Sequence, residues 1–118
     1  MDEEDSWRRA NELERGGRLR EAIEIYVKNA EKGDNLAFSA MNFLSAARCA
    51  VKLGVMDEAR EFFRKAGDLY ERLGESLEGG SHNYAEWAYL MASNCYRLSG
   101  DMEFSNRALE KAERLKKS

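Results

Sequence analysis

The chain has 118 residues, of which 43% are hydrophobic and 35% charged, and its formal net charge is −3. This length suits one domain, residues 1–118, with one continuous core, and a mildly acidic chain without a basic run argues against duplex nucleic acid as a partner. Because the chain has no proline and few β-branched residues (three Val, two Ile and no Thr), its composition argues against a sheet and favours helices.

The first pair of predicted helices covers residues 6–15 and 18–32. Ser6 or Asp5 is the candidate N-cap of the first helix, and Gly16-Gly17 ends it. Its thin apolar stripe consists of Trp7, Ala10 and Leu13. The stripe of the second helix is wider and contains Leu19, Ala22, Ile23, Tyr26 and Ala30. Both stripes have the spacing expected of helices that pack against one another.

The second pair is predicted at residues 35–53 and from Asp57 to Gly79-Gly80. The helix at 35–53 is apolar over much of its circumference, so we expect it in the middle of a stack with more than one neighbour. The next helix continues its apolar stripe past Gly74, so we expect it to pass through this residue although an internal glycine costs about 1 kcal/mol. Its stripe begins at i, i+3, i+4 and i+7 with Ala59, Phe62, Phe63 and Ala66.

The third pair is predicted at residues 84–99 and 101–117. Residues 81–83 are expected to form a loop, and Asn83 and Glu86 are spaced like a capping box at the start of the fifth helix. The sequence therefore predicts an all-α fold of six helices in three antiparallel helix-turn-helix pairs. The expected turns within the pairs are at Gly16-Gly17, Gly54 and Gly100.

One helix-turn-helix phrase recurs around these turns, at residues 17–26, 53–66 and 100–109. It resembles the tetratricopeptide repeat, and the resemblance covers nearly the whole chain. That family has small residues where the two helices of a pair cross closely. Small residues stand at the matching positions of the first helices and of the second helices, namely Ala10, Ala47 and Ser93, then Ala22, Ala59 and Ser105. The large position one turn later is occupied by Tyr26, Phe63 and Leu109.

The resemblance implies three helix pairs stacked as a short right-handed solenoid. The spacing departs from the family, because the turn glycines Gly17, Gly54 and Gly100 are 37 and 46 residues apart, whereas the family repeat has about 34 residues. No proline ends the repeats either. We therefore expect irregular, longer-than-standard tetratricopeptide-like repeats. The alternative is a bundle of three helix pairs that is unrelated to the family.

The sequence has no phosphate-binding glycine loop, nucleophile elbow or cluster with metal-ligand spacing. The single histidine, His82, stands among Gly, Ser and Asn and is interpreted as a solvated loop residue. Cys49 and Cys95 are interpreted as small buried hydrophobic residues rather than reactive thiols. We therefore expect no enzyme activity, no cofactor and no bound metal.

The resemblance also implies a concave groove lined by the first helix of each pair. Carried onto this chain, the groove residues are Trp7, Asn11, Met41, Leu44, Arg48, Lys52, Trp87, Leu90, Asn94 and Arg97. Chaperone-tail clamps of the family have a lysine where this chain has Trp7, which argues against such a clamp. The expected function is a protein-protein interaction module that binds a peptide or helix of a partner, with Arg48 and Arg97 as a cationic rim for an acidic peptide.

Two alternatives remain open at this stage. Leu44, Leu90 and Trp87 can instead pack between repeats, and the two arginines can instead pair with acids of their own chain. The alternative function is a structural or self-assembling, homo-oligomeric helical scaffold. It is motivated by the last helix pair, which has no further helix to cover it and would leave Phe104 and Leu109 partly open to a homodimer contact.

The expected location is the cytoplasm. The acidic start of the chain lacks the layout of a secretion signal. The most apolar stretch, residues 36–53, is interrupted by Ser39, Asn42, Ser45, Arg48 and Lys52, so we expect no insertion into a membrane. The identity of the protein or peptide partner is not encoded in any motif of the sequence.

Overall fold

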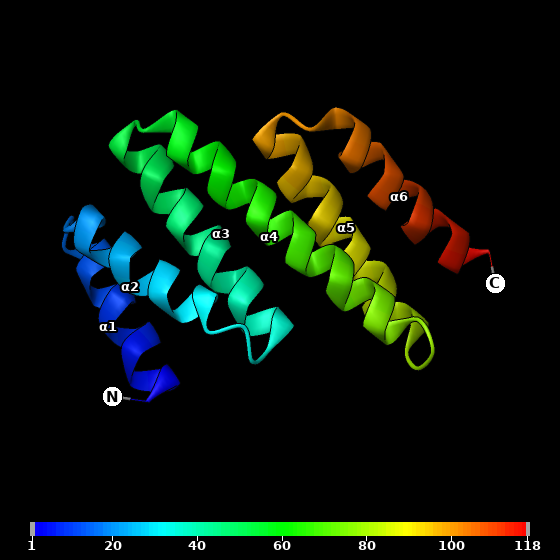
Figure 1. The fold of residues 1–118 in the computed structure, drawn as a ribbon, viewed down its shortest axis with the longest axis horizontal. Coiled ribbons are helices and arrows are strands. Elements are labelled where there is room, and N and C mark those ends of the chain that lie inside the picture. The colour runs from blue at the N-terminus through cyan, green and yellow to red at the C-terminus, as the bar shows by residue number, and fades with distance from the viewer. Residues whose placement is uncertain (1, 118) are drawn as a thin grey trace.

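The computed structural model describes residues 2–117 as six α-helices, and no strand occurs in this range. The helices are α1 (Glu3–Arg15), α2 (Leu19–Glu31), α3 (Leu36–Leu53), α4 (Met56–Leu77), α5 (His82–Ser99) and α6 (Met102–Lys116). Each helix packs mainly against the next one in the sequence. The row runs from the N-terminus at one end to the C-terminus at the other (Figure 1). The predicted all-α fold of six sequentially packed helices is confirmed.

The start of α1 differs from the prediction. The helix begins at Glu3 because the side chain of Asp2 accepts a hydrogen bond from the backbone N–H of Asp5, with 2.9 Å between Oδ1 and N. Asp2 is therefore the N-cap in place of the predicted Ser6 or Asp5. The first helix gains one turn, and its three leading acidic residues lie at the positive end of its dipole.

The start of α5 also differs from the prediction. Ser81 is its N-cap, with 3.4 Å between the Tyr84 backbone N and the Ser81 Oγ that accepts from it. The predicted loop therefore extends only to Ser81 and not to residue 83, and the predicted cap at Asn83 is wrong. His82, predicted to be a loop residue, is the first residue of the helix and is exposed.

The turns that end α3 and α5 lie at the predicted glycines. Gly54 and Gly100 have φ angles of 81° and 91°, in the left-handed region that glycine adopts without strain. In both turns the next backbone N–H donates to a carbonyl five residues back, from Val55 to Ala50 and from Asp101 to Tyr96. This is the Schellman arrangement that satisfies the free carbonyls of a helix end.

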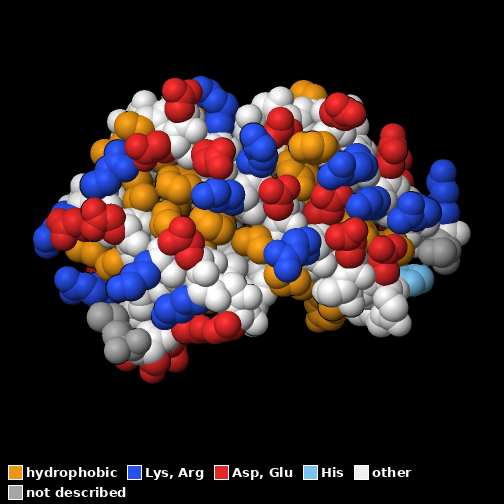
Figure 2. All heavy atoms as spheres, viewed as in Figure 1, with side chains coloured by type: hydrophobic (Ala, Val, Ile, Leu, Met, Phe, Trp, Pro, Cys, Tyr) orange, Lys and Arg blue, Asp and Glu red, His pale blue; other side chains and the backbone are white. Residues whose placement is uncertain are grey.

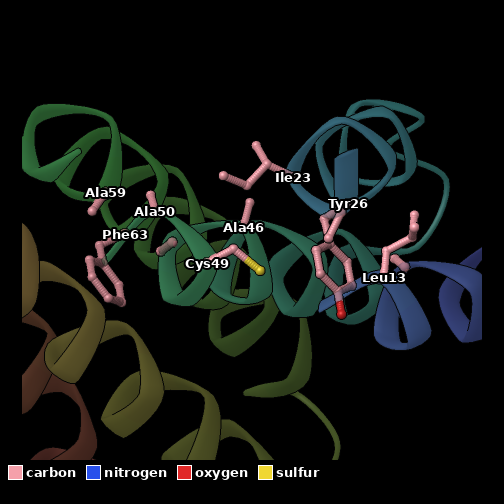
Figure 3. Close-up of a cluster of buried hydrophobic side chains, with 11 residues drawn as sticks. Leu13, Ile23, Tyr26, Ala46, Cys49, Ala50, Ala59 and Phe63 are labelled. Carbon is pink, nitrogen blue, oxygen red and sulfur yellow. The ribbon is translucent and has the colours of Figure 1, made fainter. Parts of the chain in front are cut away.

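Two clusters of buried side chains form the core. The first joins α1, α2, α3 and α4 and includes Phe63, which is 8% exposed. Figure 3 shows Phe63 and Ala59 of α4 next to Ala50 of α3. The second cluster contains buried residues of α2, α3, α4, α5 and α6. The predictions that Phe63 is buried against α3 and that α3 has more than one neighbour are confirmed.

Small residues lie where the two helices of each pair meet. Ala10 with Ala22, and Ala47 with Ala59, are fully buried. In the third pair, Ser93 and Ser105 are buried and exchange hydrogen bonds, each hydroxyl lying 2.9 Å from the other residue's carbonyl oxygen. Serine replaces alanine at this crossing because each hydroxyl finds a backbone acceptor.

The helix α4 passes through Gly74, as predicted. A Cβ at Gly74 would lie 2.7 Å from the ring of Tyr89, and a Cβ at Gly67 would lie 3.0 Å from the ring of Tyr96. The two glycines therefore leave room for two tyrosines of α5 to pack flat on α4. This close packing offsets the low helix propensity of glycine.

Candidate functional site

Ion pairs connect α1 with α3, α2 with α4, and α4 with α6, which indicates that the helices alternate between two layers. Glu14 of α1 pairs with Arg48 of α3, and Arg20 of α2 pairs with Glu58 of α4. Further ion pairs join α4 to α6. Successive helices thus alternate between an odd layer, made of α1, α3 and α5, and an even layer, made of α2, α4 and α6.

Three of the predicted groove residues, Asn11, Arg48 and Lys52, belong to a network around Glu14. Arg48 donates from Nε and Nη2 to the two carboxylate oxygens, each at 2.7 Å. The Lys52 Nζ donates to Oε2 at 2.7 Å. The Tyr26 hydroxyl lies 3.0 Å from the Glu14 Oε1 and 2.5 Å from the Asn11 Oδ1. The guanidinium fork of Arg48, predicted to face a ligand, is thus held by an acid of its own chain.

The charge of the buried Glu14 is stabilised by these donors. The hydrogen bonds from Arg48 have the largest effect and, with those from Lys52 and Tyr26, outweigh desolvation and lower the pKa of Glu14 to about 2. Burial and the neighbouring carboxylate raise the pKa of Tyr26. At neutral pH the carboxylate is therefore ionised and Tyr26 keeps its proton. The network ties α1, α2 and α3 together.

A second network of the same composition surrounds Glu71 on the even layer. The Arg107 Nη2 donates to its Oε1 at 2.9 Å, the Lys111 Nζ donates to its Oε2 at 2.8 Å, and the Tyr96 hydroxyl lies 2.9 Å from Oε1. Burial raises the pKa of Glu71, but the hydrogen bonds from Lys111, Arg107 and Tyr96 together bring it below its usual value. The sequence analysis missed both networks. The available signal was the Arg-x-x-x-Lys pattern that α3 and α6 share.

Five of the other predicted groove residues are exposed on the odd layer. They are Met41 of α3 and Trp87, Leu90, Asn94 and Arg97 of α5. The Arg97 Nη2 donates to the Asn94 Oδ1 at 3.2 Å, and within residues 2–117 Arg97 forms no ion pair. Whether any of these side chains contacts a ligand stays a prediction.

The aromatic and leucine residues of the predicted groove divide between packing and exposure. Trp7 is half-buried, with its ring 5.3 Å from that of Tyr26. Leu44 is half-buried and packs against both core clusters. For this residue the structure therefore agrees with the alternative that it packs between helices. Trp87 packs edge-on to Tyr70 at 5.8 Å and yet remains exposed. The predicted set is therefore part core and part surface.

Most of the exposed apolar residues of α3 and α5 follow one stripe on each helix. We define the α3–α5 surface as the exposed Met41, Val51, Trp87, Leu90 and Leu98 together with the half-buried Leu44. Val51 and Leu98 were missed by the sequence analysis, although each continues the helical spacing of its stripe. A shallow hollow of about 340 Å³, lined by Asn83, Tyr84 and Trp87, lies at the start of α5.

The two layers differ in charge. The odd-layer helix α3 has no Asp or Glu, and α5 has only Glu86. The even-layer helices α4 and α6 are rich in acids and bases, which pair with one another across the layer through Glu71, Glu75 and Glu78. Figure 2 shows a face on which red and blue side chains alternate around small orange areas. Ion pairs therefore join the even-layer helices to one another, whereas α3 and α5 carry one acid between them and expose mainly apolar side chains.

Groups that could carry chemistry are few in the described chain. Cys49 and Cys95 are buried and unpaired, and burial raises their pKa values to about 11 and about 12. Residues 2–117 contain no cluster of three or more His, Cys, Asp or Glu side chains arranged to hold a metal ion. In the same range, no helix combines the length and the apolar composition needed to cross a bilayer.

No protein-family model matches this chain, and no curated protein sequence matches it. The arguments for function therefore rest on the surfaces described above.

Proposed function

We propose that the chain is a protein-protein interaction module that holds the apolar face of a peptide or helix from a partner protein against the α3–α5 surface. The observation that carries this proposal is the contrast between the layers. Apolar side chains stay exposed on two odd-layer helices that carry a single acid, whereas the even-layer helices are joined to one another by ion pairs. Exposed apolar patches of this kind mark interaction sites in soluble proteins.

The dimensions and charge of the surface suggest the chemistry of the partner. Met41 and Val51 are ten residues apart on α3, which corresponds to about 15 Å, or about three turns of a docked helix. Such a helix would place apolar residues at i, i+3 or i+4, and i+7 against the two stripes. An acidic residue beside its apolar face is favoured next to Arg97, because within residues 2–117 this guanidinium forms no ion pair.

The resemblance to the tetratricopeptide repeat supports the same assignment, since that family binds ligands along the first helices of its pairs. One part of the predicted groove is revised. Because Glu14 occupies Arg48 and Lys52, the proposal relies on Arg97 for the recognition of a carboxylate. Arginine can hold a carboxylate with two parallel hydrogen bonds.

A peptide-display selection tests the proposal with two matched double variants. V51S/L98S removes apolar side chains that are 44% and 50% exposed on α3 and α5. The control M56S/M102S removes apolar side chains that are 44% and 51% exposed on α4 and α6. The pairs match in exposure, so both variants should fold equally well and differ only in the layer that they change.

The wild-type chain is expected to enrich peptides with apolar residues at helical spacing and flanking acids. V51S/L98S should weaken their binding about tenfold or more, or by about 1.4 kcal/mol, while M56S/M102S should leave it unchanged. Arg97→Glu should weaken the acidic peptides selectively. Equal binding by both double variants would overturn the proposal. In that case the alternative of a scaffold without a separate peptide ligand gains support.

A further inference from the structure

We propose that the two ends of the helix row bind one another between copies of this chain, so that molecules associate head to tail. The occupant of each end is thus a second copy of the same protein. The inference goes beyond the proposed function because it uses the outer sides of the first and last helix pairs and not the α3–α5 surface.

The N-terminal end carries an open basic groove between α1 and α2. A hollow of about 380 Å³ is lined by Ser6, Arg9, Ile25, Lys28, Asn29 and Lys32. Arg9, Lys28 and Lys32 are exposed, and within residues 2–117 none of them forms an ion pair. The acids Glu4 and Asp5 nearby are paired with Arg8. The lining of the groove therefore carries three bases and no acid.

The floor of this groove is partly apolar and lies on the side of the pair that α3 leaves uncovered. Ile25 is half-buried there. The other side of the pair is occupied, since Trp7 and Tyr26 lie against each other and Trp7 lies 6.3 Å from the ring of Phe38 of α3. A further helix placed in the groove would pack against α1 and α2 from the opposite side to α3.

The C-terminal end presents a ridge of the opposite charge. Met102 and Leu109 are exposed, and they stand seven residues apart, on one stripe of α6. Glu103, Glu110 and Glu113 are exposed on the same helix, and within residues 2–117 none of them forms an ion pair. The three acids lie along one side of the apolar stripe, and the exposed Lys116 and Lys117 follow at the end of the helix.

The acidic character of the ridge follows from how α6 packs. Arg107, Lys111 and Arg114 point to α4, where they pair with Glu71, Glu75 and Glu78. The buried side of α6 is taken by Ser105, Ala108 and Ala112. Three bases of this helix are thus paired with acids on the α4 side, and Glu103, Glu110 and Glu113 stay unpaired within residues 2–117.

The geometry of the row determines the type of assembly. The two ends lie at opposite extremes of a molecule whose longest dimension is 45 Å, so they cannot meet within one copy (Figure 1). A basic groove on one end and an acidic ridge on the other form a heterologous contact, which each further copy can extend. The expected product is an open chain of copies and not a closed dimer.

Sedimentation velocity on the whole chain tests this inference through charge reversal. The wild-type protein should gain mass with concentration in dilute salt, and concentrated salt should reverse the gain because exposed charges are screened. K28E/K32E makes the N-terminal groove acidic, and E110K/E113K makes the C-terminal ridge basic. Each variant alone should lose association about tenfold or more, because like charges then face each other. All four substitutions are at exposed positions, and circular dichroism checks that both variants remain helical.

The decisive measurement mixes the two variants. The acidic ridge of K28E/K32E still matches the basic groove of E110K/E113K, and the two reversed ends match each other, so the mixture should associate like the wild type. The variant V51S/L98S should also associate like the wild type. A monomeric wild type at high concentration in dilute salt, or a mixture that stays monomeric while the wild type associates, would overturn the inference. Association lost in V51S/L98S alone would overturn it too, because the contact would then lie on the α3–α5 surface.

Discussion

The two halves of the molecule contain the same charged network but place it in different layers. Around Glu14 the network joins odd-layer helices, and around Glu71 it joins even-layer helices. In both, a tyrosine from the helix between them reaches the carboxylate. The comparison shows that a buried glutamate with one tyrosine, one arginine and one lysine can clamp three successive helices on either side of the row.

The halves differ in how their tyrosines are packed. Tyr26 in the N-terminal half meets the ring of Trp7 edge-on at 5.3 Å. Tyr96 and Tyr89 in the C-terminal half lie on Gly67 and Gly74 of α4. Both halves place a ring beside the tyrosine of the network, since Phe104 lies 5.5 Å from Tyr96, but only the C-terminal half makes room for its tyrosines with glycines. The two halves should therefore respond differently to added or removed volume.

The largest expected effect is a loss of volume in the N-terminal core. Phe63→Ala should lower the free energy of unfolding by about 3–5 kcal/mol, since it leaves a cavity among residues of α3 and α4. Chemical denaturation measures this change. The neighbouring Phe62 is only half-buried, so Phe62→Ala is the control and should cost less. A loss below about 1 kcal/mol for Phe63→Ala would contradict its placement in the core.

The second largest effect on the free energy of unfolding is expected from added volume in the C-terminal half. Gly74→Ala should lower the free energy of unfolding by about 2 kcal/mol, because its Cβ would lie 2.7 Å from the Tyr89 ring and this clash outweighs the gain of about 1 kcal/mol in helix propensity. Gly79→Ala is the matched control, since no atom lies within 4 Å of a Cβ there. Thermal unfolding compares the two. Stabilisation by Gly74→Ala would show that the ring moves aside freely.

The third largest effect is expected when the charge of a buried glutamate is removed, and this loss of folding stability should depend on pH. Glu14→Gln should cost about 2 kcal/mol at pH 7, less than the full value of a shift from 4.5 to about 2, because Arg48 and Lys52 are half exposed to solvent. The pKa is lowered by folding, so the stabilisation is present above the unfolded value and disappears as the pH falls from about 4.5 to about 2. Urea denaturation at pH 7 and pH 2 should show the difference between wild type and variant shrink.

The matched variant Glu71→Gln should show the same sign of pH dependence, because the pKa of Glu71 is also lowered. Glu12→Gln, at an exposed position of α1, serves as the control and should change stability by less than about 0.5 kcal/mol at either pH. If only one of the two buried glutamates behaves in this way, the networks are not equivalent.

The smallest effect is expected from the tyrosine hydroxyls. Tyr26→Phe and Tyr96→Phe should each cost about 1 kcal/mol, since each removes one donor from a carboxylate that keeps its arginine and lysine. Denaturation of the single variants measures this. A double-mutant cycle of Tyr26→Phe with Glu14→Gln should show coupling, whereas Tyr26→Phe with Glu71→Gln should be additive. Coupling in the second cycle would mean that the two halves do not act independently.

The helices, their order and the burial of Phe63 followed from the sequence alone. The reason is that these features are local: apolar residues at helical spacing and glycines at turns are read within a few residues. The recurring phrase around Gly17, Gly54 and Gly100 also predicted which positions are small and buried. Leu109, at the large position of the third copy, was expected to be partly open and is 38% exposed.

The N-caps, the ion pairs and the open surfaces were decided by the tertiary structure. Asp2, Asp5 and Ser6 are all competent caps; Asp2 accepts from the Asp5 N–H, whereas the Ser6 hydroxyl donates to Asn29 of α2. Arg48 was predicted to face a ligand, and only the approach of α1 to α3 places Glu14 within 2.7 Å of it. The sequence shows which charged residues exist. Which of them form ion pairs depends on how the helices pack, because partners such as Glu14 and Arg48 are 34 residues apart in the chain. The α3–α5 surface and the two charged ends are the regions that this pairing leaves unpartnered.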